Sequence, residues 1–217
     1  METWSIVVAG GQGSRFGSAK QYAPLAGRTV LDWSLGSARR SCDGVVLVLP
    51  APDVASGRAA AWDADFVVAG GGSRSASVRA GLEAVPASAE LVAVHDAVRP
   101  LATLQLWRAV IDAVTAGADG AVPVVPVTDT IKVIGPDGDL ATLDRSTLVA
   151  VATPQAFRAV ALRKAHDQGA EATDDAALVE AQGGRVAAVI ATPGNLKITT
   201  PADLRLAEAL MREEPPW

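Results

Sequence analysis

The sequence predicts an α/β fold built on a mostly parallel sheet. Short apolar runs rich in β-branched residues recur along the 217 residues, and none alternates with period two, which is typical of strands covered on both faces. Helical patterns separate these runs, and this alternation of strand with helix favours a parallel sheet. The predicted strands are residues 6–9, 45–49, 66–69, 91–94, 121–125 and 186–190.

The clearest helical pattern between two predicted strands covers residues 103–116. Leu104, Trp107, Val110, Ile111 and Val114 recur at the spacing that places apolar side chains on one face of a helix. No repeat or low-complexity linker interrupts the chain, so we expect one domain over residues 1–217.

Residues 128–149 break the alternation with a hairpin pattern. The apolar segment 131–134 is followed by the turn sequence Gly-Pro-Asp-Gly at 135–138 and by a second apolar segment at 140–143. An isolated two-stranded hairpin buries little of its own surface. We therefore expect a projecting arm that packs on a partner.

Composition excludes several classes of protein. The chain is 49% hydrophobic and 20% charged with a net charge of −5, which disfavours nucleic-acid binding because that requires a basic surface. The single cysteine, Cys42, allows no internal disulfide and no cysteine-rich zinc site. Residues 1–9 lack the pattern of a signal peptide, and no apolar run reaches the roughly 18 residues of a membrane span. We expect a cytoplasmic protein without a membrane partner.

The loop after the first predicted strand has the composition of a phosphate-binding loop. Gly10, Gly11 and Gly13 allow backbone N–H groups to approach phosphates, and Arg15 and Lys20 add positive charge. A triphosphate would suit this loop, although a tight turn would also explain the glycines.

Two familiar phosphate loops do not fit this segment. A dinucleotide-binding fingerprint needs glycine where Phe16 stands, and a P-loop needs glycine where Ala19 precedes Lys20. A nicotinamide oxidoreductase is further disfavoured because the second predicted strand runs into Pro50 rather than an acidic residue.

Further candidate residues follow the third and fourth predicted strands. Gly71 lies in a glycine run that permits close approach to a flat base, and Ser77 is a candidate cap of the next helix. Asp96 and Arg99 follow the fourth strand, and Asp96 is a candidate ligand of a phosphate-bound Mg²⁺ or a helix cap. We expect His95 to serve as a structural hydrogen-bonding residue.

The remaining candidates lie in the second half of the chain and are individually weak. Thr130 and Arg145 belong to the predicted arm, Thr173 stands at the start of a helix, and Lys197 follows the last strand. We expect His166 to be an exposed helical residue.

Together these segments resemble the 2-C-methyl-D-erythritol 4-phosphate cytidylyltransferases, which belong to the nucleotidyltransferases. The motifs that carry the resemblance span nearly the whole chain and occur in order as AGGQGSRFG, KQY, GGGSRSASV, HDAVRP, PVTDTIK, DRSTL, TPQAF, TDDAALVE and GNLKITTPADL. The resemblance implies a Rossmann-like three-layer fold with a β-hairpin dimerisation arm, a homodimer with arm exchange, CTP and a small polyol phosphate as substrates, and Mg²⁺ or another divalent cation.

The resemblance also implies roles for residues of this chain. Arg15 and Lys20 match the pair that stabilises charge on the α-phosphate and the departing pyrophosphate, and Arg145 and Lys197 match residues that orient the acceptor phosphate. The substrate-binding candidates are Ala9, Gly10, Gly11, Gly13, Gly71, Ser77, Asp96, Arg99, Thr130 and Thr173, with Asp96 also a candidate metal ligand.

The sequence departs from the family pattern at three places and leaves two alternatives open. The spacer between Arg15 and Lys20 is short, Thr128 replaces a frequently basic residue, and Asp175 replaces the usual glutamate. Ribitol 5-phosphate cytidylyltransferases share these motifs, so the acceptor stays open. The other alternative is a non-catalytic nucleotide-binding relative. No side chain in the glycine loops dictates cytosine over uracil.

Overall fold

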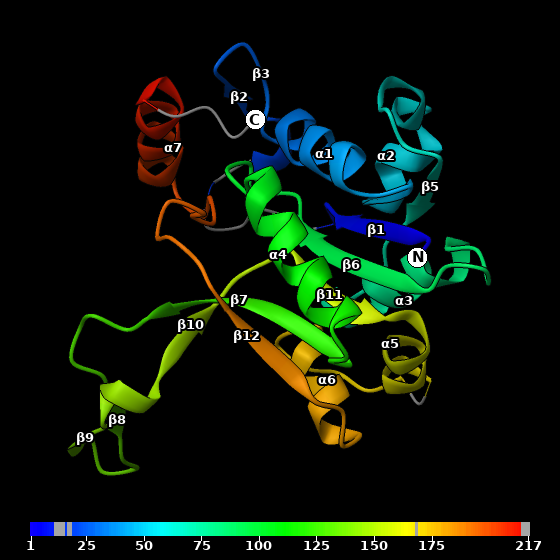
Figure 1. Ribbon diagram of the computed structural model, residues 1–217. Coiled ribbons are helices and arrows are strands. Elements are labelled where there is room, and N and C mark those ends of the chain that lie inside the picture. The colour runs from blue at the N-terminus through cyan, green and yellow to red at the C-terminus, as the bar shows by residue number, and fades with distance from the viewer. Residues whose placement is uncertain (11–15, 17–18, 168, 214–217) are drawn as a thin grey trace.

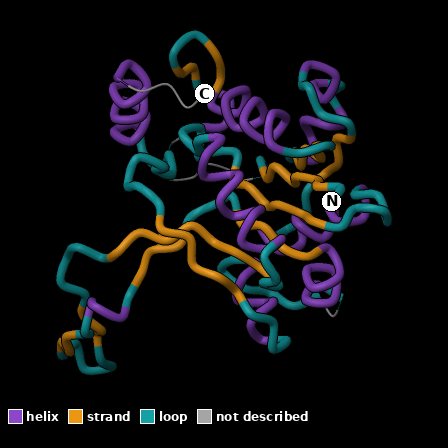
Figure 2. The backbone as a smooth tube through the Cα atoms, in the orientation of Figure 1, coloured by secondary structure: helices purple, strands orange, loops and turns teal. Residues whose placement is uncertain are grey.

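The computed structural model describes residues 1–10, 16, 19–167 and 169–213. Within these ranges a sheet of eight strands lies between two groups of helices (Figures 1 and 2). Its strands are β1 (Thr3–Val8), β4 (Gly44–Leu49), β5 (Phe66–Ala69), β6 (Leu91–Asp96), β7 (Gly120–Pro126), β10 (Val149–Val151), β11 (Gln155–Arg158) and β12 (Val186–Ile190).

The sheet is mostly parallel, as predicted. Strands β5, β4, β1 and β6 pair side by side in parallel, and β12 pairs in parallel with β7. The six predicted strands are all present. The structure adds β11, which is antiparallel to both β6 and β7, and β10, which is antiparallel to β7. Strand β11 lacks the apolar run by which the other strands were predicted, whereas β10 lies in the apolar segment 148–152, which was not predicted to be a strand.

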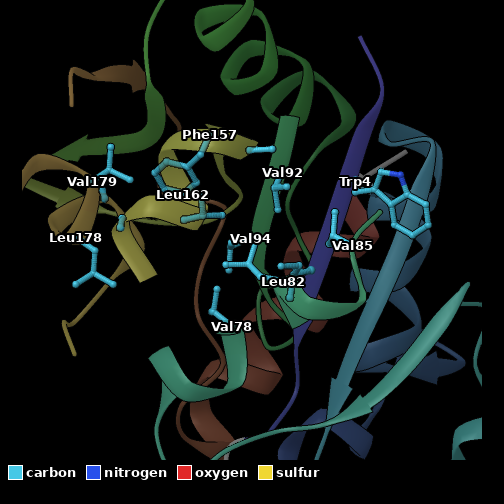
Figure 3. Packing of buried hydrophobic residues seen from close by; sticks show 14 of the residues in the cluster. Trp4, Val78, Leu82, Val85, Val92, Val94, Phe157, Leu162, Leu178 and Val179 are labelled. Atoms are coloured by element: carbon cyan, nitrogen blue, oxygen red, sulfur yellow. The ribbon is translucent and has the colours of Figure 1, made fainter. Parts of the chain in front are cut away.

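Two hydrophobic clusters, one on each face of the sheet, explain why the strand sequences are apolar at consecutive positions. Along β4, Val46 and Val48 face one cluster while Val45 and Leu47 face the other. Adjacent side chains of a strand point to opposite faces, so both faces of this strand must be apolar. Figure 3 shows the first cluster, in which Val92 and Val94 of β6 lie among side chains of α3 and α5.

The helices cover both faces of the sheet. On one face lie α1 (Val30–Ser41) and α4 (Leu104–Thr115), and on the other α3 (Arg74–Ala84), α5 (Ala159–His166) and α6 (Asp175–Ala181). The predicted helix 103–116 is confirmed as α4, with Thr103 as its N-cap and Ala116 as its C-cap. The remaining elements are α2 (Ala51–Ala55), α7 (Pro201–Glu213), the 3₁₀ turns η1 (Lys20–Tyr22), η2 (Arg58–Ala61) and η3 (Arg145–Thr147), and the short strands β2 (Pro24–Leu25) and β3 (Arg28–Thr29).

The predicted hairpin arm is also present. Strand β8 (Lys132–Ile134) pairs antiparallel with β9 (Leu140–Thr142), and the turn between them contains Gly138 at a φ of 87°, a conformation that glycine adopts without strain. Figure 1 shows the arm projecting from the end of β7 and β10. Ile134 is 73% exposed and Leu140 63% exposed, so the arm leaves apolar side chains uncovered.

No helix among the described residues is both long enough and apolar enough to cross a membrane.

Candidate functional site

The site candidates gather where β1, β4, β5 and β6 end. These four strands are parallel neighbours, so their carboxyl ends lie at one edge of the sheet, where open α/β sheets bind ligands. Ala9 continues β1 and donates its N–H to the carbonyl of Val48 at 2.8 Å. The buried Gln21 side chain donates to the Ala9 carbonyl at 3.1 Å. The end of β1 is therefore tied both to β4 and to the η1 turn.

The two glycine-containing loops meet at Ser77. A Cβ atom on Gly10 would lie 3.5 Å from Ser77 Oγ, and a Cβ on Gly70 would lie 2.8 Å from the same atom. A Cβ on Gly71 would lie only 2.5 Å from the Cβ of Ala76, so a larger residue would force the loop to move. Glycines at these positions thus let the loops after β1 and β5 approach each other and the start of α3.

The prediction that Ser77 caps the helix is wrong. Ser73 is the N-cap of α3 and accepts the N–H of Ala76 at 3.0 Å. Ser77 lies one turn further along, is buried, and donates its hydroxyl to the Ser73 carbonyl at 2.9 Å. The cap is therefore Ser73, which directly precedes Arg74, the first residue of the helix.

Asp96 lies between two cations at the end of β6, rather than at a helix start. One carboxylate oxygen accepts from Lys197 Nζ at 2.7 Å and the other from Arg74 Nε at 3.4 Å. Burial raises the pKa of the Asp96 carboxyl, but the charges of Lys197 and Arg74 outweigh burial and hold it well below its usual range. The carboxylate is therefore ionised at neutral pH.

The segment that carries Lys197 is held against β6 by backbone and side-chain hydrogen bonds. Ile198 donates its N–H to the Val98 carbonyl at 2.9 Å, and the Asn195 side chain donates to the Thr153 carbonyl at 2.8 Å. Arg99 Nη1 donates to the Asn195 carbonyl at 2.8 Å. Arg99 was predicted to contact substrate, and in the structure its guanidinium braces the loop that positions Lys197.

His95 has the structural role that the sequence analysis expected. The ring is fully buried, and its Nε2 lies 3.2 Å from the Arg99 carbonyl oxygen while its Nδ1 lies 3.1 Å from Thr153 Oγ1. A carbonyl oxygen only accepts, so Nε2 carries the proton and Nδ1 accepts from Thr153. The Thr153 hydroxyl in turn accepts the backbone N–H of Asp96 at 3.0 Å. His95 therefore fixes the backbone of Asp96 at the end of the strand.

A pH dependence of stability follows from His95. Burial lowers its pKa from 6.5 to about 4, so below pH 6.5 the unfolded chain takes up a proton that the folded chain does not. Stability from this residue is present above pH 6.5 and lost as pH falls toward 4, at up to about 1.4 kcal/mol per pH unit. Denaturant unfolding of His95→Gln should lack this slope, whereas equal slopes in wild type and variant would contradict the assignment.

Lys20 begins the η1 turn directly beyond the first glycine loop. Burial raises the pKa of the Asp203 carboxyl, but hydrogen bonds from the Thr200 and Thr199 backbone outweigh this, and the nearby charge of Lys20 acts in the same direction as those hydrogen bonds. Lys20 thus lies close to the start of α7. Of the other predicted loop residues, Gly11, Gly13 and Arg15 lie outside the described residues.

The arm residues do not join the site of their own chain. Arg145 donates to the carbonyl of Thr128 at 2.8 Å, and both it and Thr130 are exposed. Figure 1 shows the arm extending away from the ends of β1 and β6. Thr173 is also exposed, and Asp174 rather than Thr173 caps α6 by accepting the Ala177 N–H at 3.0 Å.

The structure adds three residues that the sequence analysis did not assign to the site: Arg74, Asp175 and His166. Arg74 Nη1 donates to Asp175 at 2.8 Å, and His166 Nε2 lies 3.0 Å from the other oxygen of that carboxylate. The expectation that His166 is exposed is wrong, because its side chain is only 3% exposed. Arg74 and Asp175 stand in the motifs GGGSRSASV and TDDAALVE, but nothing in the sequence indicates that they meet, because they lie 101 positions apart.

A metal ion would find few protein ligands here. Over the part of the chain that the structure describes, no three histidine, cysteine, aspartate or glutamate side chains lie close enough to hold one. Asp96 is the carboxylate at the strand ends, and both of its oxygens already accept from cations. A single carboxylate is compatible with Mg²⁺ only where substrate phosphates supply most of the ligands, because Mg²⁺ binds through one or two carboxylates and otherwise through phosphates and water.

Comparisons with known proteins all give one family. The model of the family "IspD: 2-C-methyl-D-erythritol 4-phosphate cytidylyltransferase" matches residues 3–213. The enzyme of that name from Symbiobacterium thermophilum is 45% identical over 96% of this chain and 92% of its own length. A "Bifunctional enzyme IspD/IspF" from Clavibacter michiganensis is 43% identical over 96% of this chain, which spans only 54% of that relative.

Solved structures give the same result. The crystal structure of 2-C-methyl-D-erythritol 4-phosphate cytidylyltransferase from Thermus thermophilus matches 95% of this chain and 98% of its own, with a TM-score of 0.78 and 35% identity. The 4-diphosphocytidyl-2C-methyl-D-erythritol synthase from Anaerococcus prevotii matches 97% of this chain and 98% of its own, with a TM-score of 0.83 and 28% identity.

Proposed function

The chain belongs to the IspD family of 2-C-methyl-D-erythritol 4-phosphate cytidylyltransferases, and we propose that it transfers a cytidylyl group from CTP to 2-C-methyl-D-erythritol 4-phosphate. The product is the 4-diphosphocytidyl derivative, and pyrophosphate is released. The observation that carries this proposal is the ionised Asp96 held between Lys197 and Arg74 at the sheet edge where two glycine-containing loops meet.

The reaction needs alignment and charge stabilisation more than proton transfer. A phosphate oxygen of the acceptor attacks the α-phosphorus of CTP, a new P–O bond forms, and the bond to the β-phosphate breaks. The acceptor phosphate is already ionised at neutral pH, so no general base is required, and catalysis comes from positioning and from electrostatic stabilisation. This is consistent with a site whose identified polar groups are mainly cations around one carboxylate.

We assign roles to the residues on this basis. Lys20 and Arg15 have the roles that the resemblance implies, the stabilisation of charge on the α-phosphate and on the departing pyrophosphate. Lys197 binds the acceptor phosphate, and Asp96 contacts the acceptor hydroxyl groups or the metal. Bound Mg²⁺, or another divalent cation, would neutralise phosphate charge and reduce the repulsion between the two anionic substrates.

The arm suggests how the acceptor site is completed. Arg145 and Thr130 lie on a projecting hairpin with exposed apolar side chains, and the resemblance implies that each arm completes the site of a partner subunit. We propose a homodimer in which Arg145 reaches the acceptor phosphate bound by the other protomer. A cytoplasmic location stays a prediction.

The dimer can be tested through an exposed side chain of the arm. Ile134→Asp should convert the dimer to a monomer and lower turnover, because a charge on an apolar contact surface must be desolvated on association. Val160→Asp is the matched control: Val160 on α5 is 74% exposed, like Ile134 at 73%, but lies off the arm. Analytical ultracentrifugation and circular dichroism give the readout. A variant that stays dimeric and active would rule out the arm as the interface.

The experiment that tests the function is pyrophosphate release from CTP and Mg²⁺ with two acceptors offered separately. We expect release with 2-C-methyl-D-erythritol 4-phosphate and its loss on chelation of the metal. Release with ribitol 5-phosphate alone would keep the chemistry and change the acceptor. Release with neither would leave a non-catalytic nucleotide-binding relative as the better description.

A further inference from the structure

A chain of alternating charges leads from the buried interior to Asp96. Asp175 has a fully buried side chain, and its two oxygens contact Arg74 Nη1 at 2.8 Å and His166 Nε2 at 3.0 Å. Arg74 contacts Asp96 at 3.4 Å, and Asp96 contacts Lys197 at 2.7 Å. Arg74 thus bridges the buried carboxylate and the carboxylate of the site.

Three helix ends bring these side chains together. Arg74 is the first residue of α3, His166 is the last residue of α5, and Asp175 is the first residue of α6. Asp175 lies 101 residues along the chain from Arg74. An ionised carboxylate is very costly to bury unless it is paired and hydrogen-bonded, so the buried Asp175 requires Arg74 and His166 to stay in place. The same requirement fixes the direction of the Arg74 guanidinium.

The two cations on Asp96 differ in their freedom to move. The Lys197 side chain is 43% exposed, whereas that of Arg74 is 23% exposed and anchored on Asp175. An anionic phosphate that enters the site will attract the exposed ammonium group. Once Lys197 turns toward the phosphate, the charges of Arg74 and Arg99 still compensate Asp96, and Arg74, which contacts the carboxylate at 3.4 Å, holds it in one orientation.

We propose that Asp175 and His166 are positioning residues for the transfer reaction, which act through Arg74 to hold Asp96 in place when Lys197 engages the acceptor phosphate. This inference rests on the proposed function for its kinetic test. It adds to the site a buried pair, from α5 and α6, that need not touch either substrate.

The kinetic test is Asp175→Asn, which keeps the size of the side chain and removes its charge. We expect kcat/KM for the acceptor to fall by about 10–100-fold, the loss typical when a residue that orients a metal ligand is mutated. KM for CTP should change less than about 2-fold, because the effect acts through Asp96, which is assigned to the acceptor or the metal. Asp175→Glu, which restores the charge, should recover most of the loss. If the asparagine variant does not fold, His166→Phe removes the other partner of Asp175 and should show the same selective fall in acceptor kcat/KM.

Arg163→Gln provides the control for a purely structural role. Arg163 also lies on α5, and its guanidinium donates to the carbonyls of Leu82, Val85 and Pro86. Its loss should lower thermal stability and leave acceptor kcat/KM unchanged. If Asp175→Asn lowers stability in the same way without the selective kinetic effect, the positioning role is refuted.

A second readout does not depend on activity. The Nε–H signal of Arg74 in ¹⁵N NMR spectra, assigned by its absence in Arg74→Lys, should be protected from exchange in the wild type and lose that protection in Asp175→Asn. An unchanged signal would overturn the inference. A wild type that releases no pyrophosphate with either acceptor would refute the proposed function alone, and the NMR result would still decide whether Asp175 positions Arg74.

Discussion

Replacing Lys20 with methionine should lower kcat by about 10²–10³-fold, the loss typical when one preorganised group that stabilises transition-state charge is removed. Lys20 begins the turn that Gln21 ties to the end of β1, so its backbone is held next to the expected triphosphate site. Methionine keeps the length of the apolar stem and removes only the charge. Pyrophosphate release at saturating CTP and acceptor measures the effect.

Lys20→Met should remain folded, and a second lysine variant tests whether the loss of any lysine charge lowers turnover. Lys20 is only partly buried, so thermal unfolding of Lys20→Met should lie close to that of the wild type. Lys164→Met removes an exposed lysine from α5 and should alter neither turnover nor stability. Near wild-type turnover in Lys20→Met, with the same stability, would remove Lys20 from the reaction.

Replacing Asp96 with asparagine should reduce both activity and stability. The Asp96 side chain is 11% exposed and contacts Lys197 and Arg74. Loss of one member of a buried charge cluster costs about 3 kcal/mol because the remaining charges are left uncompensated. Acceptor kcat/KM should fall by about 10²-fold or more, since the group that orients the acceptor or the metal is lost. Kinetics and denaturant unfolding measure the two effects separately.

The matched control for Asp96 is Asp65→Asn. Asp65 also pairs with an arginine, Arg39 at 2.8 Å, and accepts a backbone N–H from Val45 at 2.8 Å, but it lies before β5 and at the opposite end of that strand from the site. This change should lower stability and leave kinetics unchanged. An active Asp96→Asn enzyme would exclude the carboxylate from the acceptor and metal roles.

The ionisation of Asp96 adds a pH signature. Its pKa lies below the value in the unfolded chain because the charges of Lys197 and Arg74 outweigh burial. The stability that Asp96 contributes is therefore fully present above about pH 4, the ordinary aspartate pKa, and is lost as pH falls below it. Above this pH the Asp96 carboxylate stays ionised, so its protonation should not lower activity. Any fall in wild-type activity toward acid pH should therefore persist in Asp96→Asn.

Local patterns were enough to predict much of the fold. The run 45–49 is apolar at every position because β4 packs against helices on both faces. The hairpin was recognisable from its Gly-Pro-Asp-Gly turn, and α4 from its apolar face. These features depend on residues within a few positions of one another, so periodicity and turn chemistry suffice to identify them.

Strand β11 could not be predicted in this way. The segment Gln155–Arg158 has neither a long apolar run nor a period-two pattern, and it becomes a strand because β6 and β7 both offer unpaired backbone groups on either side of it. Burial of such a segment is favourable only when its N–H and C=O groups are paired. The partners lie more than thirty positions away in the sequence, beyond the reach of a local pattern.

The sequence by itself determined the alternation of strands and helices, the hairpin arm, and the placement of Asp96 at the end of one strand and of Lys197 beyond another, because each follows from short-range periodicity or from the polarity of a sheet. Only the tertiary structure decided which charges meet. His166 is buried rather than exposed, and Arg74 lies between Asp96 and Asp175. The physical reason is that a buried charge is stable only beside a compensating partner, and the folded chain alone selects that partner from residues about a hundred positions apart.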